Sequence, residues 1–117
     1  MILCVPSSSE NGMESEVGLH FGRVPYYTIV EDEKVRIIKN TSRHMDGIKY
    51  PPELLKNEGV DVMICREIGG RAVKMFREIG IDVYVGASGK VSDAVESFRK
   101  NQLAMVGKNH VCRGHGD

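Results

Sequence analysis

The stretch GVDVMICREIGGRAVKMFREIGIDVYV, residues 59–85, has the pattern of a strand, a helix and a second strand in direct succession. Residues 60–65 and 81–85 are short runs rich in apolar, β-branched side chains, which is typical of strands buried on both faces of a sheet. Between them the apolar residues recur at the spacing of one helix face, at Ala72, Val73, Phe76 and Ile79. Gly80 ends this predicted helix. Because a helix joins the two strands, we expect them to be parallel and predict the α/β fold class.

The rest of the chain extends this sheet. Residues 1–5 form a third apolar run, and residues 26–31 and 34–39 have the pattern of a β-hairpin with a charged turn. A short helix is predicted at 52–58, and a last helix is indicated by the helical spacing of Val91, Ala94, Val95 and Phe98. The predicted order is β-β-β-α-β-α-β-α. It gives a three-layer α/β sandwich around a five-stranded mixed sheet, with the hairpin antiparallel on one side.

Length and composition indicate a single small domain. The chain has 117 residues, and we assign 1–103 to one domain and 104–117 to a flexible tail that contains Cys and His. Sixteen basic and sixteen acidic side chains cancel, which argues against a nucleic-acid partner or an anionic membrane surface. The first residues lack the basic flank of an export signal, so we expect a cytoplasmic protein. Three cysteines do not form a disulfide framework and are expected to be reduced.

A binding site is expected beyond the carboxyl ends of the parallel strands, where α/β sheets hold their ligands. The helix that begins near Gly69 and Gly70 offers free backbone N–H groups to an anion, and glycine lets a ligand approach the backbone closely. Imidazole and thiolate bind iron or copper, and arginine pairs with anionic groups. This edge therefore suits an anionic, metal-containing ligand, and its candidate residues are Ser7, Ser8, Ser9, His20, Arg23, Cys65, Arg66, Gly69 and Gly70.

Each candidate side chain also has a plain structural interpretation. His20 is either a metal ligand or a loop histidine whose ring nitrogens bond to backbone. Cys65 is either a ligand, with a pKa lowered by the following helix start, or a small buried residue. Cys4 is expected in the core, Phe21 is expected to anchor its loop, and Gly22 is expected to supply a backbone conformation.

The C-terminal tail contains a second cluster of donor residues. Its last residues read H-x-C-x-x-H-x-D, and the spacing of Cys112 and His115 is compatible with chelation. Such a tail would bind metal, in one interpretation by completing a site of another subunit. The alternative is a solvated chain end without this function. Both interpretations stay open at this point.

The segments SEVGLHFGRVPYYTIVE and GVDVMICREIGGRAVKMFREIGIDVYV, with the tail CRGHGD, resemble the dinitrogenase iron–molybdenum cofactor biosynthesis family from Met1 to about Leu103. The resemblance implies a ribonuclease-H-like fold and a non-enzymatic carrier of an iron–sulfur-type cluster or a nitrogenase cofactor precursor. It also implies that His20 contacts the cluster, and it makes iron–sulfur or nitrogenase assembly proteins the expected partners. The alternative hypothesis is a small regulatory or adaptor domain that binds an anionic metabolite or a protein partner without metal.

Motifs of common enzymes do not fit the chain. GASGKV has its glycines too close together for a phosphate loop, and Val91 stands where a magnesium-binding hydroxyl is needed. A two-metal nuclease needs carboxylates that hold two metal ions on adjacent strand positions. The first strand has none, and Asp61 and Asp82 lie at the strand starts, away from the expected binding edge. Neither a C-x-x-C pair nor a G-x-S-x-G motif is present. We therefore expect no enzymatic activity.

Overall fold

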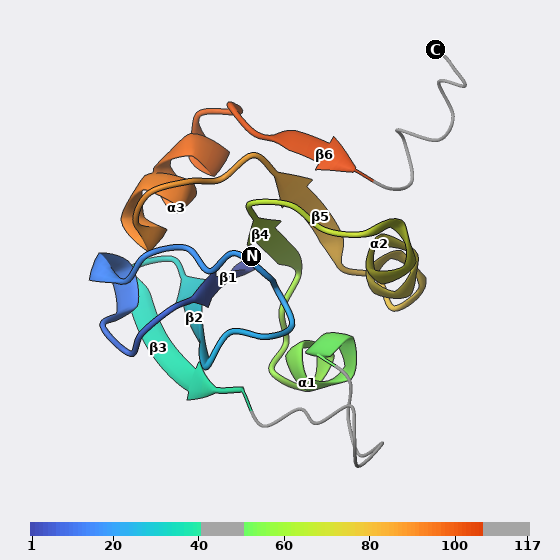
Figure 1. Cartoon of the computed structure of the whole chain (residues 1–117), viewed down its shortest axis with the longest axis horizontal. Helices are drawn as coiled ribbons and strands as arrows, with labels where there is room; N and C mark the ends of the chain where they lie inside the picture. The colour runs from blue at the N-terminus through green and yellow to red at the C-terminus, as the bar shows by residue number, and fades with distance from the viewer. Residues whose placement is uncertain (41–50, 107–117) are drawn as a thin grey trace.

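The computed structural model describes residues 1–40 and 51–106 and shows a mixed sheet covered by helices on both faces (Figure 1). The strand order is β3-β2-β1-β4-β5-β6. The elements in chain order are β1 (Ile2–Ser7), the 3₁₀ turn η1 (Gly12–Glu14), β2 (Tyr26–Glu31), β3 (Lys34–Lys39), α1 (Pro51–Asn57), β4 (Val62–Cys65), α2 (Gly70–Glu78), β5 (Asp82–Val85), α3 (Val91–Arg99) and β6 (Ala104–Val106).

The predicted strand directions are confirmed. β1, β4 and β5 are parallel, and the β2–β3 hairpin is antiparallel beside β1. The helices α1 and α2 end close to Gly59 and Gly80, which have φ values of +82° and +86°. Glycine adopts this left-handed conformation without the penalty that a Cβ brings, which explains why both helices end there.

The prediction of five strands is wrong, because the described chain forms six. The sixth, β6, pairs antiparallel with β5 and matches Val83 with Val106 and Val85 with Ala104. It lies within the segment 104–117 that the sequence led us to expect as a flexible tail. A strand of 3 residues is too short to show a period of two, which is why the sequence did not predict it.

The sheet alternation divides the core into two layers. On the face of α1 and α2, Cys4, Tyr27, Met63 and Cys65 pack with Phe76. On the opposite face, which α3 covers, the buried residues include Leu3, Val5, Ile64, Val91 and Val95. Successive residues of β1 and β4 point to opposite faces, so continuous apolar runs are needed to fill both layers.

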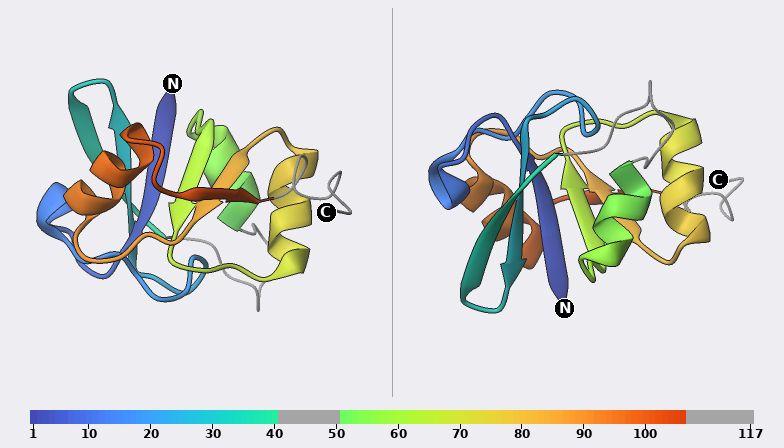
Figure 2. Two further views of the ribbon diagram at one scale, coloured as in Figure 1. Left: turned by 90° about the horizontal axis from the view of Figure 1, so that it is seen from above. Right: turned by 90° about the horizontal axis from the view of Figure 1, so that it is seen from below.

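The chain segments that follow the parallel strands lie at the same end of the sheet, which we call the carboxyl edge. Figure 2 shows the loops after β1, β4 and β5 at this end, whereas the N-terminus and the β2–β3 turn lie at the other. Backbone bonds join these loops: Ala87 N donates to Cys65 O at 3.1 Å and Val17 N donates to Gly89 O at 2.9 Å. The predicted site residues are therefore to be sought on one continuous edge.

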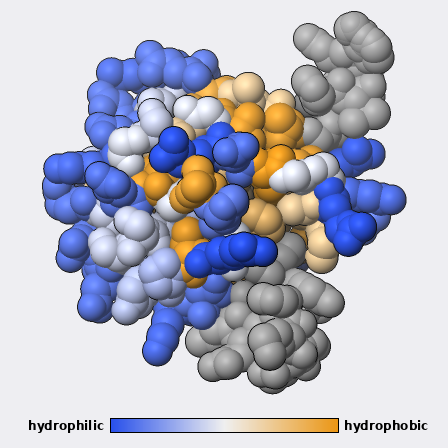
Figure 3. All heavy atoms as spheres, viewed as in Figure 1, coloured by the Kyte–Doolittle hydropathy of each residue, from blue (hydrophilic) through white to orange (hydrophobic). Residues whose placement is uncertain are grey.

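The molecular surface is mixed. On the face shown in Figure 3, hydrophobic residues gather in the region of β5 and β6, and hydrophilic residues dominate much of the periphery. Within the described residues, no helix is long and apolar enough to cross a membrane.

Candidate functional site

The carboxyl edge is dominated by residues 15–25, which we call the His20 loop. Its first half is tied to the sheet by backbone hydrogen bonds. Gly18 N donates to Pro6 O at 2.8 Å, Val91 N donates to Ser15 O at 2.8 Å, and Val17 forms an antiparallel bridge with Ser7. An irregular segment is thus tied by its backbone to β1 and to the start of α3.

Gly18 is required by this close approach. A Cβ atom at Gly18 would lie 2.1 Å from Cγ1 of Val24, which is buried. Real carbon atoms do not approach so closely, and the two arms of the loop could not pack with a larger residue at this position. The sequence analysis missed this residue, although a glycine between Val17 and Leu19 is a signal of close backbone contact.

The second half of the His20 loop is anchored by side chains. The Phe21 ring packs edge-on against Phe76 of α2, with ring centroids 5.4 Å apart, and the Tyr27 hydroxyl donates to Phe21 O at 2.7 Å. Asn40, just after β3, donates its side-chain amide to Gly22 O at 3.1 Å and to Val24 O at 2.8 Å. The prediction that Phe21 anchors the loop is confirmed. Asn40 could not be found from sequence, because its contacts span 16 and 18 residues.

Two candidate side chains are presented to solvent by this anchored loop. His20 and Arg23 are both exposed, and Arg23 N donates to His20 O at 3.3 Å, so a tight turn joins them. Leu19 beside them is 50% exposed. The interior packing of Phe21 and Val24 fixes the backbone, while the neighbouring residues remain available to a ligand.

Cys65 lies at the carboxyl end of β4 as predicted, but its chemistry is different. The side chain is buried in the core layer that contains Phe76, and burial raises the pKa of the Cys65 thiol to about 12. The prediction that the start of α2 lowers this pKa is wrong. Desolvation of the thiolate dominates, since α2 starts only at Gly70 and the thiol faces apolar neighbours.

Cys4 is buried in the same layer, which confirms its prediction as a core residue. Burial raises its pKa, and the nearby Cys65 thiolate would raise it further. For Tyr27, burial and then the two cysteines raise the pKa well above its ordinary value. These three groups are therefore neutral in the folded protein around neutral pH.

The start of α2 is open. Gly69 is its N-cap residue and no side chain caps the helix there. Gly69 and Gly70 are exposed, and a Cβ at either position would meet no atom within 4 Å. The first N–H groups of a helix lack intrahelical partners, so this end can receive an anion without a change in the protein. The exposed Arg66 precedes it in the same loop.

The three serines after the first strand have different environments. Ser7 is buried, and its hydroxyl lies 2.7 Å from that of Thr28. The Ser9 hydroxyl lies 2.8 Å from the Ser15 hydroxyl, and this hydrogen bond joins two parts of the loop. Ser8 is exposed, and its N–H donates to Glu16 O at 3.0 Å. Among these three, Ser8 is the candidate with a hydroxyl accessible to a ligand.

Of the nine candidates at the carboxyl edge, six are exposed, Ser9 is half-buried, and Ser7 and Cys65 are buried. The exposed six are Ser8, His20, Arg23, Arg66, Gly69 and Gly70, whereas Cys65 is buried in the core. In the part of the chain that the structure describes, no group of three or more His, Cys, Asp or Glu side chains could hold a metal ion. Cys112 and His115, predicted as tail ligands, lie outside the described residues.

These features define a small α/β domain with an open edge that carries cations, an imidazole and free helix N–H groups. The chain belongs to the dinitrogenase iron-molybdenum cofactor family, whose model matches residues 1–101. It is 34% identical over 91 residues to an uncharacterized protein of Methanocaldococcus jannaschii, an alignment that covers 72% of this chain and 77% of the relative.

Solved structures show the same fold. The protein PH0822 superposes with a TM-score of 0.75 at 27% identity, covering 91% of this chain and 96% of that one. The apo form of the orange protein from Desulfovibrio gigas superposes with a TM-score of 0.78 at 22% identity, covering 91% of this chain and 92% of that one. The family relates the chain to small proteins of nitrogenase cofactor metabolism, and the predicted family resemblance is confirmed.

Proposed function

We propose that this protein is a non-enzymatic carrier that binds an iron–sulfur-type cluster or a nitrogenase cofactor precursor at its carboxyl edge. The observation that carries the proposal is the anchored His20 loop, which holds an exposed imidazole and an exposed guanidinium together at this edge. Family membership over residues 1–101 supports the class of cargo. The ribonuclease-H-like arrangement, a cytoplasmic location and assembly proteins as partners stay predictions.

Each exposed residue has a role that its chemistry permits. The His20 imidazole is an iron ligand, and Arg23 and Arg66 attract the negative charge that sulfide and thiolate ligands give such clusters. The N–H groups after Gly69 and the Ser8 hydroxyl donate hydrogen bonds to the same anion. An edge with few ligands can bind cargo and release it again, which a carrier requires.

The buried thiol does not fit a ready ligand. Cys65 is only 1% exposed and its pKa is about 12, so it is a neutral thiol beneath the edge. Coordination by Cys65 would require local opening together with loss of the proton. The proposed site therefore rests first on His20 and Arg23, and we retain Cys65, Cys112 and His115 as ligands to be tested separately.

The direct test is anaerobic reconstitution with ferrous iron and sulfide, followed by absorbance spectra and iron analysis. We expect the native chain to take up a cluster and His20→Ala to take up much less. Lys34→Ala, an exposed cation at the opposite end of the sheet, is the matched control and should load normally. Equal loading of the His20→Ala and native chains, or no loading of either, would refute the role of His20.

The contribution of charge is tested with the arginines. Arg23→Gln is expected to weaken loading and to reduce its dependence on salt, because it removes a cation from the edge. Arg99→Gln on α3 removes an exposed cation elsewhere and serves as the control. The double variant Cys112→Ala and His115→Ala tests the tail in the same assay.

A second candidate function is supported by the burial of Cys65. With its thiol protonated in the core, the edge presents an imidazole, two arginines and helix N–H groups, which also suit an anionic metabolite without metal. Such a regulatory or adaptor domain would bind its ligand in the presence of chelators. It would depend on Arg23 but not on His20 as a metal ligand, and metal analysis of protein purified without air separates the two functions.

A further inference from the structure

β3 is an edge strand with an open outer side in the described part of the chain. It is the outermost strand at one end of the sheet, beside β2, and it pairs with β2 without interruption from Lys34 to Lys39. All its residues are exposed or half-exposed. An uninterrupted strand of this length presents a row of N–H and C=O groups to which another strand can bind.

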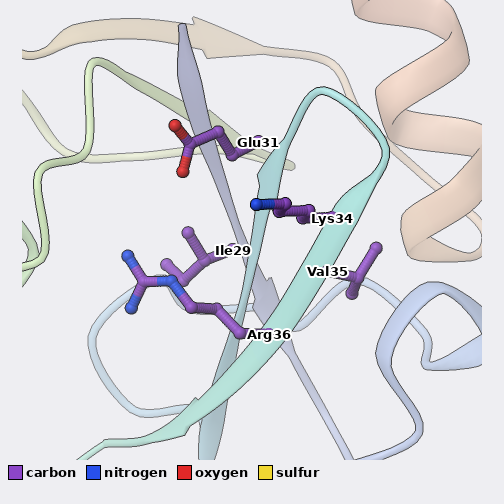
Figure 4. Close-up of a pocket in the computed structure, with 5 residues that line it drawn as sticks. All are labelled: Ile29, Glu31, Lys34, Val35 and Arg36. Carbon is purple, nitrogen blue, oxygen red and sulfur yellow. The ribbon is translucent and has the colours of Figure 1, made fainter.

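The two faces of β3 differ in chemistry. Lys34 and Arg36 lie across from Glu31 and Ile29 on the face of α1 and α2. Val35 and Ile37 lie on the other face and are 43% and 41% exposed, which is unusual for large apolar side chains in a strand. Figure 4 shows Val35 pointing away from the side on which Ile29, Glu31 and Arg36 lie.

A groove of about 430 Å³ lies along this part of the hairpin (Figure 4). Its lining combines apolar and charged side chains, namely Ile29, Glu31, Lys34, Val35 and Arg36. The Arg36 guanidinium is held by Glu58, to whose backbone oxygen it donates at 2.9 Å. The acidic groups Glu31 and Glu58 come from β2 and from the residue after α1, both toward the middle of the sheet.

We propose that the outer edge of β3 binds an extended segment of a partner protein in which acidic and apolar residues alternate. Added as a further strand, this segment would place its acidic side chains beside Lys34 and Arg36 and its apolar side chains beside Val35 and Ile37. Lys34 and Arg36, which also line the groove beside the hairpin, are the cations of β3 on this face. The alternation of cationic and apolar residues along β3 thus determines the sequence pattern expected of the partner segment.

Charge decides against a second copy of this chain as the occupant. β3 contains Lys34, Arg36 and Lys39 and no acidic residue, so pairing of two copies would set cations beside cations. Like charges across a strand pair are destabilising, and lysines on edge strands commonly prevent self-pairing. The same charges attract an acidic strand, which gives the edge selectivity for a different partner.

The test uses the full chain and a fluorescent hexapeptide of the pattern Glu-Val-Glu-Val-Glu-Val, with the corresponding Lys-Val peptide as control. We expect the fluorescence anisotropy of the acidic peptide to rise to saturation as protein is added, and that of the lysine peptide to stay unchanged. In NMR spectra of the protein, the acidic peptide should change the chemical shifts of amides in β3 and its neighbours only. The charge-reversed variant Lys34→Glu should weaken binding by about tenfold or more, because it replaces attraction with repulsion.

An altered peptide tests strand pairing without changing the protein. Methylation of alternate peptide nitrogens removes one set of backbone donors, and methylation on the side that faces β3 should abolish binding. The proposal is overturned if the acidic peptide does not bind, if Lys34→Glu leaves the affinity unchanged, or if both methylated peptides bind equally. Self-association of the native chain through β3 in sedimentation experiments would also overturn it.

Discussion

At the scale of single residues, Gly18 determines whether the His20 loop can close. Gly18→Ala should lower the free energy of unfolding by about 1–3 kcal/mol, because its Cβ would lie 2.1 Å from Val24 Cγ1. Chemical denaturation measures this loss. Gly70→Ala is the control, since nothing lies within 4 Å of the added atom, and it should be neutral or stabilising.

The double variant Gly18→Ala with Val24→Ala separates a clash from a general effect of the loop. Val24→Ala removes the Cγ1 atom, so the double variant should be more stable than the sum of the two single losses predicts. If the two losses in the free energy of unfolding simply add, the effect of Gly18→Ala does not come from a clash with Val24.

Asn40 acts at the same scale on the other half of the loop. Asn40→Ala removes the donors to Gly22 O and Val24 O, and should cost about 1–3 kcal/mol of stability. Hydrogen exchange of the loop amides should accelerate more than that of β4. If cluster loading depends on the loop geometry, loading falls as well. Unchanged hydrogen exchange in the loop would contradict the proposed role of the Asn40 hydrogen bonds.

Residue patterns predicted some of these roles and missed others for identifiable reasons. Phe21 could be assigned because an aromatic residue in a polar loop needs an apolar contact. Cys65 was placed correctly at a strand end, but its pKa depends on how many apolar side chains surround it, which no local pattern gives. Asn40 acts through contacts distant in sequence, so only the fold reveals it.

At the scale of elements, β4 carries a thiol that stays protonated while the protein is folded. The Cys65 pKa is about 12 in the folded protein against 9.0 for an unperturbed thiol. The folded chain therefore keeps a proton that the unfolded chain releases, and stability should fall as pH rises from about 9 to 12. Urea denaturation across this window should show a shallower decline for Cys65→Ala.

Thiol labelling provides an independent check on the same strand. At pH 8 a thiol reagent should react slowly with Cys4 and Cys65 in the native chain and rapidly in denaturant, because both are buried and neutral. Cys112 lies outside the described residues, so Cys112→Ala is the background for the measurement. Rapid native labelling of that variant would mean that the core around β1 and β4 opens readily.

β6 tests the boundary that the sequence analysis placed after Leu103. A chain that ends at Val106 should retain the stability of the full chain, whereas one that ends at Leu103 should be less stable. Loss of β6 leaves β5 as an unpaired edge and uncovers Val83 and Val85. Denaturation midpoints of the two truncated chains measure the difference. Equal midpoints would show that β6 adds nothing to the domain.

At the scale of the whole molecule, most of the sheet was predictable, because β1, β4 and β5 are short apolar runs and the β2–β3 hairpin has a charged turn. The exception was β6, whose 3 residues are too few to show a strand pattern and which pairs with β5. The carboxyl edge followed from topology, since the loops after the parallel strands β1, β4 and β5 lie at one end of the sheet (Figure 2). Which of these residues face solvent did not follow, because side-chain burial is decided by packing between elements.

The cargo proposal makes a prediction for the molecule as a unit, because its site joins segments from different parts of the chain. A ligand that binds only the folded state adds RT ln(1 + [L]/Kd), which is about 2.7 kcal/mol at a hundredfold excess over Kd. The loaded protein should therefore melt at a higher temperature than the cluster-free protein, and removal of iron by a chelator should reverse the shift. Lys34→Ala should behave like the native chain, while His20→Ala should gain little. A cluster that loads without raising the melting temperature, or that raises it equally in His20→Ala, would place the cargo somewhere other than the carboxyl edge.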